Sequence, residues 1–173
     1  MPNLNHIKLL ILDVDGVLTD GSIIVNDQGV EAKRFHVRDG LAIKIAQNAG
    51  LQIAVITGRA TNAVNLRITE LGIKHLIQGA KNKATALKQI NKLTNTTPQQ
   101  VAYVGDDLID LPAMTKINYP IAVADAAEPV QHIAKFITTA PGGKGAVRQA
   151  IEHILQAQNK WDDIVKYYLN LQA

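Results

Sequence analysis

Four short polar motifs carry the residue types that chemistry on an anionic group requires: carboxylates, a hydroxyl and an ammonium. Asp13-Val14-Asp15-Gly16-Val17 follows an apolar run, and Thr57-Gly58-Arg59 follows a later one. Lys83 stands at the start of a helical segment, and Gly105-Asp106-Asp107-Leu108-Ile109-Asp110 follows another apolar run. Because the carboxyl ends of parallel strands meet at one edge of a sheet, we expect these side chains to converge there.

A phosphoryl group is the reacting centre that this combination of side chains suits. Its negative charge repels a carboxylate nucleophile such as Asp13 unless a cation lies between them. Asp13 and Asp106 offer oxygen ligands to Mg²⁺, which prefers an octahedral shell of oxygens. Thr57 and Lys83 offer hydrogen-bond donors to the remaining phosphoryl oxygens. Asp15 is spaced to protonate a leaving alkoxide and then to deprotonate an attacking water.

Each motif taken alone has a structural explanation. An Asp-x-Asp pair after a strand is more often a turn or a helix cap than a catalytic pair. Lys83 alone is more often a solvated helix residue, and Thr57-Gly58 and Gly105-Asp106-Asp107 also suit simple turns. The occurrence of all four motifs, in order, at successive strand ends favours the catalytic interpretation.

The elements that must position these motifs follow a regular alternation of short β-rich runs and helical segments. This alternation is typical of an α/β fold, a Rossmann-like doubly wound parallel sheet with helices on both faces. The expected strands are residues 7–12, 53–56, 75–77, 101–104, 121–123 and 136–137. The expected helices are residues 40–48, 60–71, 83–93, 108–115 and 127–134, and one long amphipathic helix from Ala146 to about Leu169.

One segment interrupts this alternation. Residues 22–26 and 30–36 flank the turn Asp27-Gln28-Gly29, a pattern that predicts a β-hairpin. We expect this hairpin, about residues 21–37, to project from the sheet as a flap. The 173 residues suit one domain with one core, spanning residues 1–173, with a C-terminal helix or tail over about residues 146–173.

Composition narrows the classes of protein. The chain is 47% hydrophobic and 19% charged, with a mean hydropathy of +0.02, as in soluble globular proteins. No apolar run approaches the length of a membrane span, and the start lacks the pattern of a signal peptide. The absence of cysteine suits a reducing compartment, so we expect a cytoplasmic protein. The net charge of +3 comes from scattered basic residues, which suits an anionic substrate and gives nucleic-acid binding no support.

The order of these motifs resembles that of the haloacid dehalogenase superfamily: DxD, then Thr or Ser, then Lys, then GDDxxxD. This resemblance implies that Asp13 is the nucleophile and Asp15 the acid/base. It also implies Mg²⁺ ligands from Asp13, the Asp15 main-chain carbonyl and Asp106, and phosphate contacts from Thr57, Gly58 and Lys83. Asp107 and Asp110 would orient metal waters or Lys83. The spacing leaves no room for a cap domain, so the site needs another means of excluding water and recognising substrate, and a neighbouring subunit can supply both.

A closer resemblance is to a capless family within it, the homotetrameric 3-deoxy-D-manno-octulosonate 8-phosphate phosphatases of lipopolysaccharide precursor synthesis. The matching stretches are residues 13–21, 35–40, 57–59, 78–79 with 82–83, 105–110, and 142–143 with 145–148. The implied substrate-binding residues are Asp15, His36, Val37, Arg38, Asp39, Gly40, Lys44, Arg59, Arg67 and Lys83. Lys44 departs from the arginine expected there, and a lysine cannot bind a carboxylate with two parallel hydrogen bonds.

Three other interpretations remain at this point. A related phosphatase could act on another nonulosonate or an acylneuraminate phosphate. A phospho-receiver regulatory module shares the fold, the acidic ligands, the Thr and the Lys, although its acceptor Asp follows the third strand rather than the first. A binding protein that lost catalysis is disfavoured by the complete set of motifs. The segment 161–173 matches no expected feature and is interpreted as packed helix, while the glycine-rich stretch 142–145 suits a flexible loop or a tail that reaches a neighbouring site.

Overall fold

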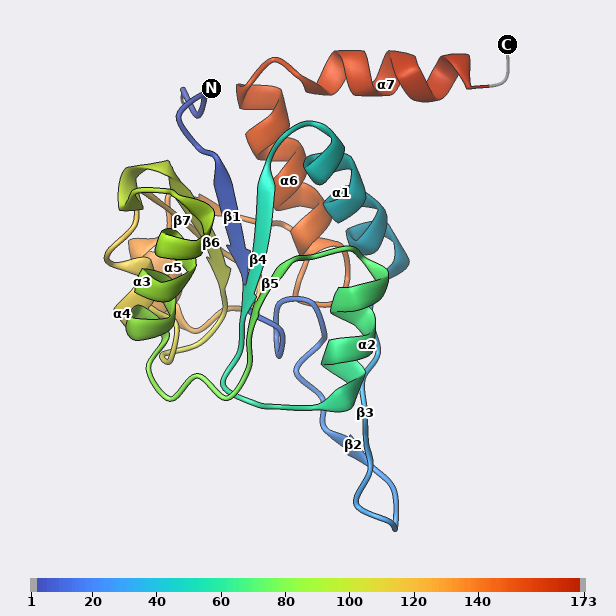
Figure 1. Cartoon of the computed structure of the whole chain (residues 1–173), viewed down its shortest axis with the longest axis vertical. Helices are drawn as coiled ribbons and strands as arrows, with labels where there is room; N and C mark the ends of the chain where they lie inside the picture. Colours follow the sequence, from blue (N-terminus) through green and yellow to red (C-terminus); the bar gives the residue numbers. More distant parts are fainter. Residues whose placement is uncertain (1–2, 172–173) are drawn as a thin grey trace.

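The computed structural model describes residues 3–171, and these form a parallel sheet of six strands covered by helices on both faces (Figure 1). The strand order is β5-β4-β1-β6-β7-β8, so the chain builds outward from β1 in one direction and then in the other. This arrangement confirms the predicted doubly wound α/β fold. The strands are β1 (Leu9–Leu12), β4 (Gln52–Ile56), β5 (His75–Ile77), β6 (Val101–Gly105), β7 (Tyr119–Ala122) and β8 (Phe136–Ile137).

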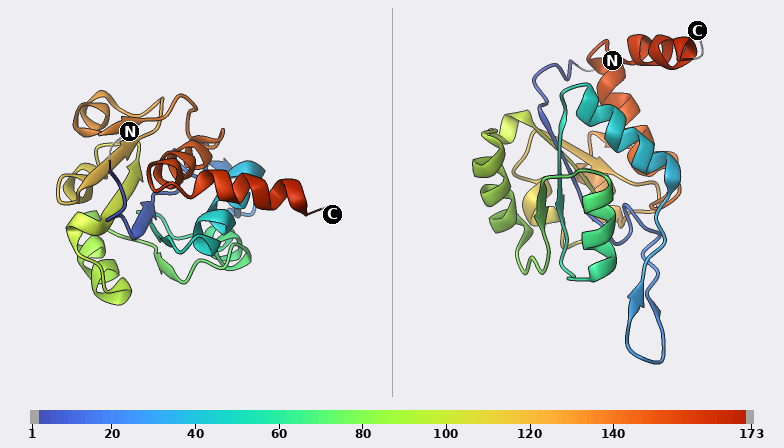
Figure 2. Two further views of the ribbon diagram at one scale, coloured as in Figure 1. Left: turned by 90° about the horizontal axis from the view of Figure 1, so that it is seen from above. Right: turned by 45° about the vertical axis from the view of Figure 1, so that its right-hand side comes forward.

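The central strands are apolar along their whole length because helices bury them from both sides. Every residue of β1 and of β6 is buried, which is the pattern of strands inside a parallel sheet. Helices α1, α2 and α6 cover one face, and α3, α4 and α5 cover the other (Figures 1 and 2). Their bounds are α1 (Val37–Asn48), α2 (Asn62–Glu70), α3 (Lys83–Thr94), α4 (Leu111–Met114), α5 (Glu128–Ile133), α6 (Ala146–Ala157) and α7 (Trp161–Asn170), with a 3-10 turn at Pro98–Gln100.

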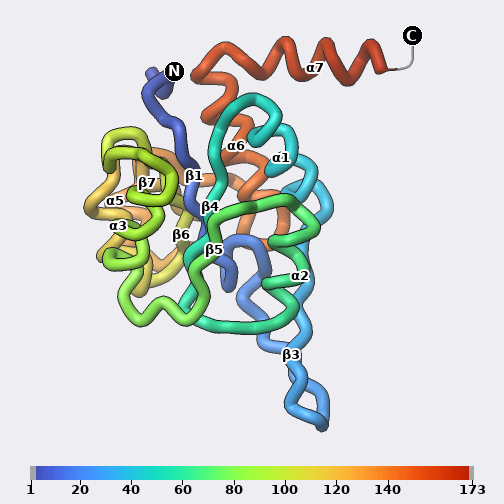
Figure 3. Tube along the Cα trace, viewed as in Figure 1, coloured from blue at the N-terminus to red at the C-terminus, as the bar shows by residue number. Residues whose placement is uncertain are grey.

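A two-stranded antiparallel hairpin, β2 (Ile24–Val25) with β3 (Glu31–Ala32), extends away from the body of the molecule (Figures 1 and 3). Its paired strands have two residues each and are shorter than the sequence predicted. Ile24 retains 50% and Val25 55% of their surface exposed. Such an isolated hairpin with apolar residues in water has little stability of its own.

The prediction of one long C-terminal helix is wrong. The chain breaks after α6 at Asn159, whose φ of 56° lies in the left-handed region. The side-chain amide of Gln158 donates to the carbonyls of Leu4 at 3.0 Å and Ile7 at 2.9 Å, which fixes the break against the start of the chain. Helix α7 then runs away from the body, at the end opposite the hairpin (Figure 1). Gln172 and Ala173 of the expected tail, like Met1 and Pro2, lie outside the described residues.

Helix α4 is also shorter than expected, because it begins at Leu111 rather than at residue 108. The Asp110 carboxylate accepts hydrogen bonds from the Asp106 and Asp107 amides, and residues 108–110 form a turn before the helix begins. Within residues 3–171, no helix combines the length and apolar composition that crossing a membrane requires.

Candidate active site

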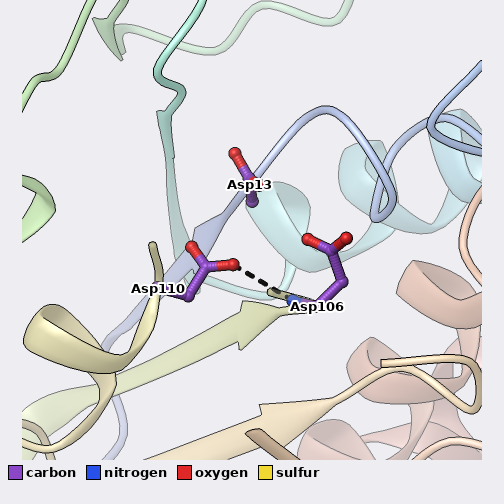
Figure 4. Close-up of side chains that lie close together, drawn as sticks. All are labelled: Asp13, Asp106 and Asp110. Carbon is purple, nitrogen blue, oxygen red and sulfur yellow. Dashed lines mark hydrogen bonds between the residues drawn. The ribbon is translucent and has the colours of Figure 1, made fainter. Parts of the chain in front are cut away.

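The sheet brings the first and last acidic motifs together. Strands β1 and β6 are neighbours at the point where the order of the sheet reverses, and Asp13 and Asp106 directly follow them. Ligands in such folds bind at this switch point, beyond the carboxyl ends of the strands. Asp13, Asp106 and Asp110 lie close together there (Figure 4), and one carboxylate oxygen from each lies within 4.8 Å of the others.

Lys83 joins this group from the first turn of α3. The Asn82 side chain accepts a hydrogen bond from the Thr85 amide at 3.1 Å, caps α3 and so places Lys83 at the start of the helix. Its Nζ lies 2.8 Å from Asp13 Oδ1 and 2.6 Å from Asp110 Oδ1. Burial by itself lowers the pKa of Lys83, but the charges of Asp13 and Asp110 outweigh it and raise the pKa. Lys83 is therefore a buried permanent cation at neutral pH.

Asp110 is saturated with hydrogen-bond donors. Its Oδ1 accepts from Lys83 Nζ and from the Tyr103 hydroxyl at 2.8 Å, and its Oδ2 accepts from the amides of Asp106 at 3.1 Å and Asp107 at 3.3 Å. This carboxylate therefore positions Lys83 and the loop after β6 and has little capacity left for a cation. Asp107 is exposed, and its own carboxylate accepts from the Leu108 amide.

The oxygens of Asp13 and Asp106 fit a divalent cation. Among residues 3–171, nothing donates a hydrogen bond to the buried Oδ1 of Asp106. Burial first, and then the charges of the neighbouring carboxylates, raise the pKa of Asp13 to about 7 and that of Asp106 to about 8. Gly16 adds space, because a Cβ there would lie 2.0 Å from Asp106 Oδ2. Hard carboxylate oxygens that need a counter-charge are the ligands that Mg²⁺ prefers.

Asp15 lies in a second charged group, which includes two residues of the hairpin. Lys33 Nζ donates to Asp15 Oδ1 and lies 2.8 Å from Glu31 Oε1. Glu31 Oε2 accepts from Arg59 Nη2 at 2.5 Å, and Arg59 Nε lies 3.9 Å from Asp15 Oδ2. The sequence prediction missed Glu31 and Lys33. The available signal was their spacing, because residues two apart on a strand point to the same face.

Thr57 follows β4 and is buried, and Gly58 and Arg59 after it are exposed. The Thr57 main chain is held on both sides: its amide donates to Ile77 O at 2.9 Å, and its carbonyl accepts from the Ala80 amide at 3.0 Å. The loop carrying the hydroxyl is therefore fixed by β5 and by the segment that leads to Lys83.

With this geometry in view, comparisons with known proteins decide the family. Residues 75–151 match the model of haloacid dehalogenase-like hydrolases. The chain is 45% identical to the 3-deoxy-D-manno-octulosonate 8-phosphate phosphatase of Escherichia coli, over 94% of this chain and 87% of that protein. The chain belongs to the haloacid dehalogenase-like hydrolases.

Solved structures of this family superpose over nearly the whole chain. The 3-deoxy-D-manno-octulosonate 8-phosphate phosphatase of Moraxella catarrhalis, solved with magnesium ion, phosphate ion and KDO, gives a TM-score of 0.93 at 43% identity and covers 96% of this chain and 95% of that one. The cobalt-bound enzyme of Haemophilus influenzae gives a TM-score of 0.89 at 44% identity and covers 92% of this chain and 93% of that one.

Some of the residues that the family resemblance implied for substrate binding are exposed, and others are buried. At the start of α1, Val37 and Arg38 are exposed, whereas Asp39 is 1% exposed. Asp39 Oδ1 accepts from the Arg148 amide at 2.7 Å, so this carboxylate holds the first turn of α6. His36 Nδ1 lies 3.7 Å from Asp39 Oδ2. The structure thus directs Asp39 into the protein rather than toward solvent.

Arg67 and Lys44 lie apart from the Asp13 group. Arg67 donates to Glu70 at 2.8 Å, and its guanidinium lies 5.8 Å from the centre of the Phe35 ring. Gly40 lets the guanidinium lie close to α1, because a Cβ there would lie 2.3 Å from Arg67 Nη2 and would displace it. Lys44 is exposed on α1. Within residues 3–171 no hydrogen bond or ion pair joins Arg67 or Lys44 to Asp13, Lys83 or Asp106. A groove beside Arg67 is lined by Lys33, Phe35, Val37, Ala63, Leu66, Arg67 and Glu70.

The glycine-rich stretch 142–145 forms a turn that packs against the loop after Asp13 of its own chain. A Cβ at Gly142 would lie 1.8 Å from the carbonyl oxygen of Gly16. Gly142 donates its amide to Asp125 Oδ1 at 2.9 Å, and the Gly143 amide donates to Val17 O at 3.0 Å. These contacts brace the loop that follows Asp13, a structural role that the sequence analysis did not assign to this stretch.

Proposed function

We propose that the protein is a Mg²⁺-dependent phosphatase that hydrolyses 3-deoxy-D-manno-octulosonate 8-phosphate to the free sugar acid and phosphate, in lipopolysaccharide precursor synthesis. The observation that carries this proposal is the likeness, over nearly the whole chain, to the Moraxella catarrhalis enzyme, whose structure contains magnesium, phosphate and KDO. The group of buried Asp13 and Lys83 with half-buried Asp106 supports it, because it supplies a nucleophile, a fixed cation and metal ligands in one place.

The reaction proceeds in two steps through the chain's own carboxylates. A carboxylate oxygen of Asp13 attacks phosphorus and the ester P–O bond breaks, while Asp15 gives its proton to the departing sugar oxygen. A water then attacks the aspartyl-phosphate and loses its proton to Asp15. The bond to Asp13 breaks, phosphate leaves, and both carboxyl groups return to their starting states.

The remaining motif residues hold the phosphoryl group. Lys83, Thr57 and the Gly58 amide donate to its oxygens, and Asp110 keeps Lys83 in place. Mg²⁺, bound by Asp13, Asp106 and the Asp15 main-chain carbonyl, neutralises the repulsion between the nucleophile and the phosphoryl group. Asp107 lies beside these ligands in an exposed position that suits contact with metal-bound waters.

The far end of the substrate, with its carboxylate and hydroxyls, is recognised by cations and backbone around the hairpin base. Arg59 and Arg67 offer guanidinium groups, Lys44 offers a weaker single contact, and residues His36 to Gly40 offer side-chain and main-chain groups. Asp39 contributes from inside, by holding this segment against α6.

The active assembly is a homotetramer in which the hairpins form subunit contacts. The support is the exposed apolar surface of the hairpin, since Ile23, Ile24, Val25 and Val30 are each at least 50% exposed. Apolar surface of this kind on a projecting, weakly stable element is stabilised by burial against a neighbour. In the tetramer a neighbouring subunit would also cover the capless site and exclude water from it.

A phosphate-release screen tests the function. Wild-type protein is assayed with Mg²⁺ on 3-deoxy-D-manno-octulosonate 8-phosphate, an acylneuraminate 9-phosphate, hexose phosphates and p-nitrophenyl phosphate. We expect the octulosonate ester to give the highest kcat/KM. Preference for an acylneuraminate ester would replace the substrate and keep the phosphatase, whereas preference for neutral hexose phosphates would overturn the sugar-acid assignment. No phosphate release from any ester would overturn the enzymatic function itself.

A further inference from the structure

Lys33, at the base of the hairpin, is buried in a way that its sequence neighbours are not. Its side chain is 1% exposed, whereas Ala32 and Arg34 on either side are exposed. Fully buried lysines are rare and occur where a partner compensates the charge. The partners here are Asp15 and Glu31, both within ion-pair distance of Nζ.

These partners keep Lys33 charged. Burial by itself lowers the pKa of Lys33, but the hydrogen bond to Asp15 and the negative charges of Asp15 and Glu31 outweigh it, and the pKa is raised. Glu31 in turn pairs with Arg59 at 2.5 Å, so its carboxylate joins both cations that approach Asp15. The hairpin base is thereby tied to the catalytic loop by charge as well as by chain connection.

The two oxygens of Asp15 are in different situations. Oδ1 accepts from Lys33, whereas no hydrogen bond from residues 3–171 reaches Oδ2, and Arg59 Nε lies 3.9 Å away from it. An acid/base must lie within hydrogen-bond reach of two different oxygens during the reaction, first that of the leaving group and then that of the water. A carboxylate anchored by one oxygen keeps the other free and in a fixed direction for both transfers.

We propose that Lys33 is a positioning residue for Asp15: it holds Oδ1 and leaves Oδ2 to give and take the proton. The proposal rests on the proposed function, because the acid/base role of Asp15 is part of it. Within residues 3–171, no hydrogen bond or ion pair joins Lys33 to Thr57 or Lys83, the residues proposed to hold the phosphoryl group. Loss of its ammonium therefore acts on the proton transfers and leaves binding of the phosphoryl group in place.

A double-mutant cycle on the full-length protein tests this assignment. Lys33→Met, Asp15→Asn and the double variant are assayed for kcat and KM on whichever ester the wild type hydrolyses fastest. A different physiological substrate therefore leaves the test intact. We expect Lys33→Met to lower kcat about 10- to 100-fold with little change in KM, as misplacement of a catalytic group does. The double variant should be no slower than Asp15→Asn alone, because Lys33 acts only through Asp15.

Two further variants separate positioning from folding. Lys33→Arg retains the charge and should restore part of the lost kcat, whereas Arg34→Met removes the exposed hairpin cation that pairs with Asp20 and should keep wild-type kcat. Thermal unfolding identifies any variant that fails to fold; if Lys33→Met does, the cycle is made with Lys33→Gln. Multiplying losses in the double variant would overturn the proposal. A raised KM with unchanged kcat would also overturn it, because Lys33 would then bind substrate in the adjoining groove.

Discussion

The carboxylate cluster at the sheet edge (Asp13, Lys83, Asp106 and Asp110) and the hairpin that projects beside it differ in burial and in the contacts that their side chains make. Asp13, Lys83 and Asp110 are buried, and their partners come from β1, α3 and the loop after β6 of the same chain. The hairpin pairs only Ile24–Val25 with Glu31–Ala32 and exposes its apolar side chains. The charged groups of the cluster are thus stabilised inside the core of the chain, whereas the apolar side chains of the hairpin lie exposed, as the proposed subunit contacts require.

The largest effect should follow from removing the nucleophile of the cluster. Asp13→Asn leaves an amide that cannot form the phosphoenzyme, so we expect phosphate release to fall by about 10⁴-fold or more, as when other catalytic nucleophiles are removed. Circular dichroism should show an unchanged fold. Steady-state turnover near the wild-type rate, with deamidation of the introduced asparagine excluded by mass spectrometry, would contradict the assignment of the nucleophile.

Asp110→Ala should be the most destabilising change in the cluster. It leaves Lys83 with one carboxylate and the buried Tyr103 hydroxyl without an acceptor. Breaking a buried pair costs about 3–5 kcal/mol, so the free energy of unfolding in urea should fall by that amount. The matched control is Asp107→Ala, an exposed neighbour whose loss should change stability by about 0.5 kcal/mol or less. Equal losses for the two variants would contradict the buried-pair account.

The hairpin should respond differently from the cluster. Ile24→Lys places a charge on its exposed apolar surface, so we expect smaller particles by light scattering and loss of kcat/KM of up to about 100-fold through a less closed site. Thermal stability of the body should change little, because no core residue is touched. Gln28→Lys, at the polar turn of the same hairpin, is the control and should assemble as the wild type does. A wild-type protein that is monomeric and fully active would refute the assembly.

The sequence predicted the cluster better than the hairpin for a physical reason. Asp13 and Asp106 are far apart in the chain, but the topology of a doubly wound sheet makes β1 and β6 neighbours, so strand-end motifs converge whatever fills the connections. The burial of Lys33 depends on how the hairpin base meets the loop after Asp13, which no local pattern specifies. The break at Asn159 escaped prediction likewise, because amphipathic periodicity continues into α7 while the conformation changes at one residue.

Replacing Arg67 tests the proposed recognition of the substrate carboxylate beside the hairpin. We expect a moderate loss of activity that depends on the substrate. The Arg67 guanidinium already pairs with Glu70, and the Arg67 side chain retains 18% exposure, so loss of a contact with a substrate carboxylate should cost about 1–2 kcal/mol, below the range for fully buried pairs. Arg67→Ala should therefore lower kcat/KM for the sugar-acid ester about 5- to 30-fold and leave p-nitrophenyl phosphate nearly unaffected. Equal losses on both esters would assign Arg67 to folding or to the common chemistry.

The smallest expected effect concerns the protonation of Asp13 and Asp106 when no cation is bound. The native pKa values of Asp13, about 7, and Asp106, about 8, lie above the ordinary value of 3.8. Between about pH 4 and pH 8 the metal-free native state therefore holds more protons than the unfolded state, so its stability falls as pH rises through this window. Mg²⁺ competes with those protons for the same oxygens, and its affinity should rise over the same window.

The Mg²⁺-induced increase in Tm should consequently be larger at pH 8.5 than at pH 6, by roughly 2–4 °C if the difference in stability is about 1 kcal/mol. Asp106→Asn removes one ligand and one proton site, so it should flatten this pH dependence, whereas Asp107→Asn should retain it. Differential scanning calorimetry at both pH values, with EDTA and with Mg²⁺, measures all three proteins. An increase in Tm that is independent of pH in the wild type would mean that the cation binds outside the Asp13–Asp106 pair. The proposed assignment of Asp13 and Asp106 as the Mg²⁺ ligands would then be wrong.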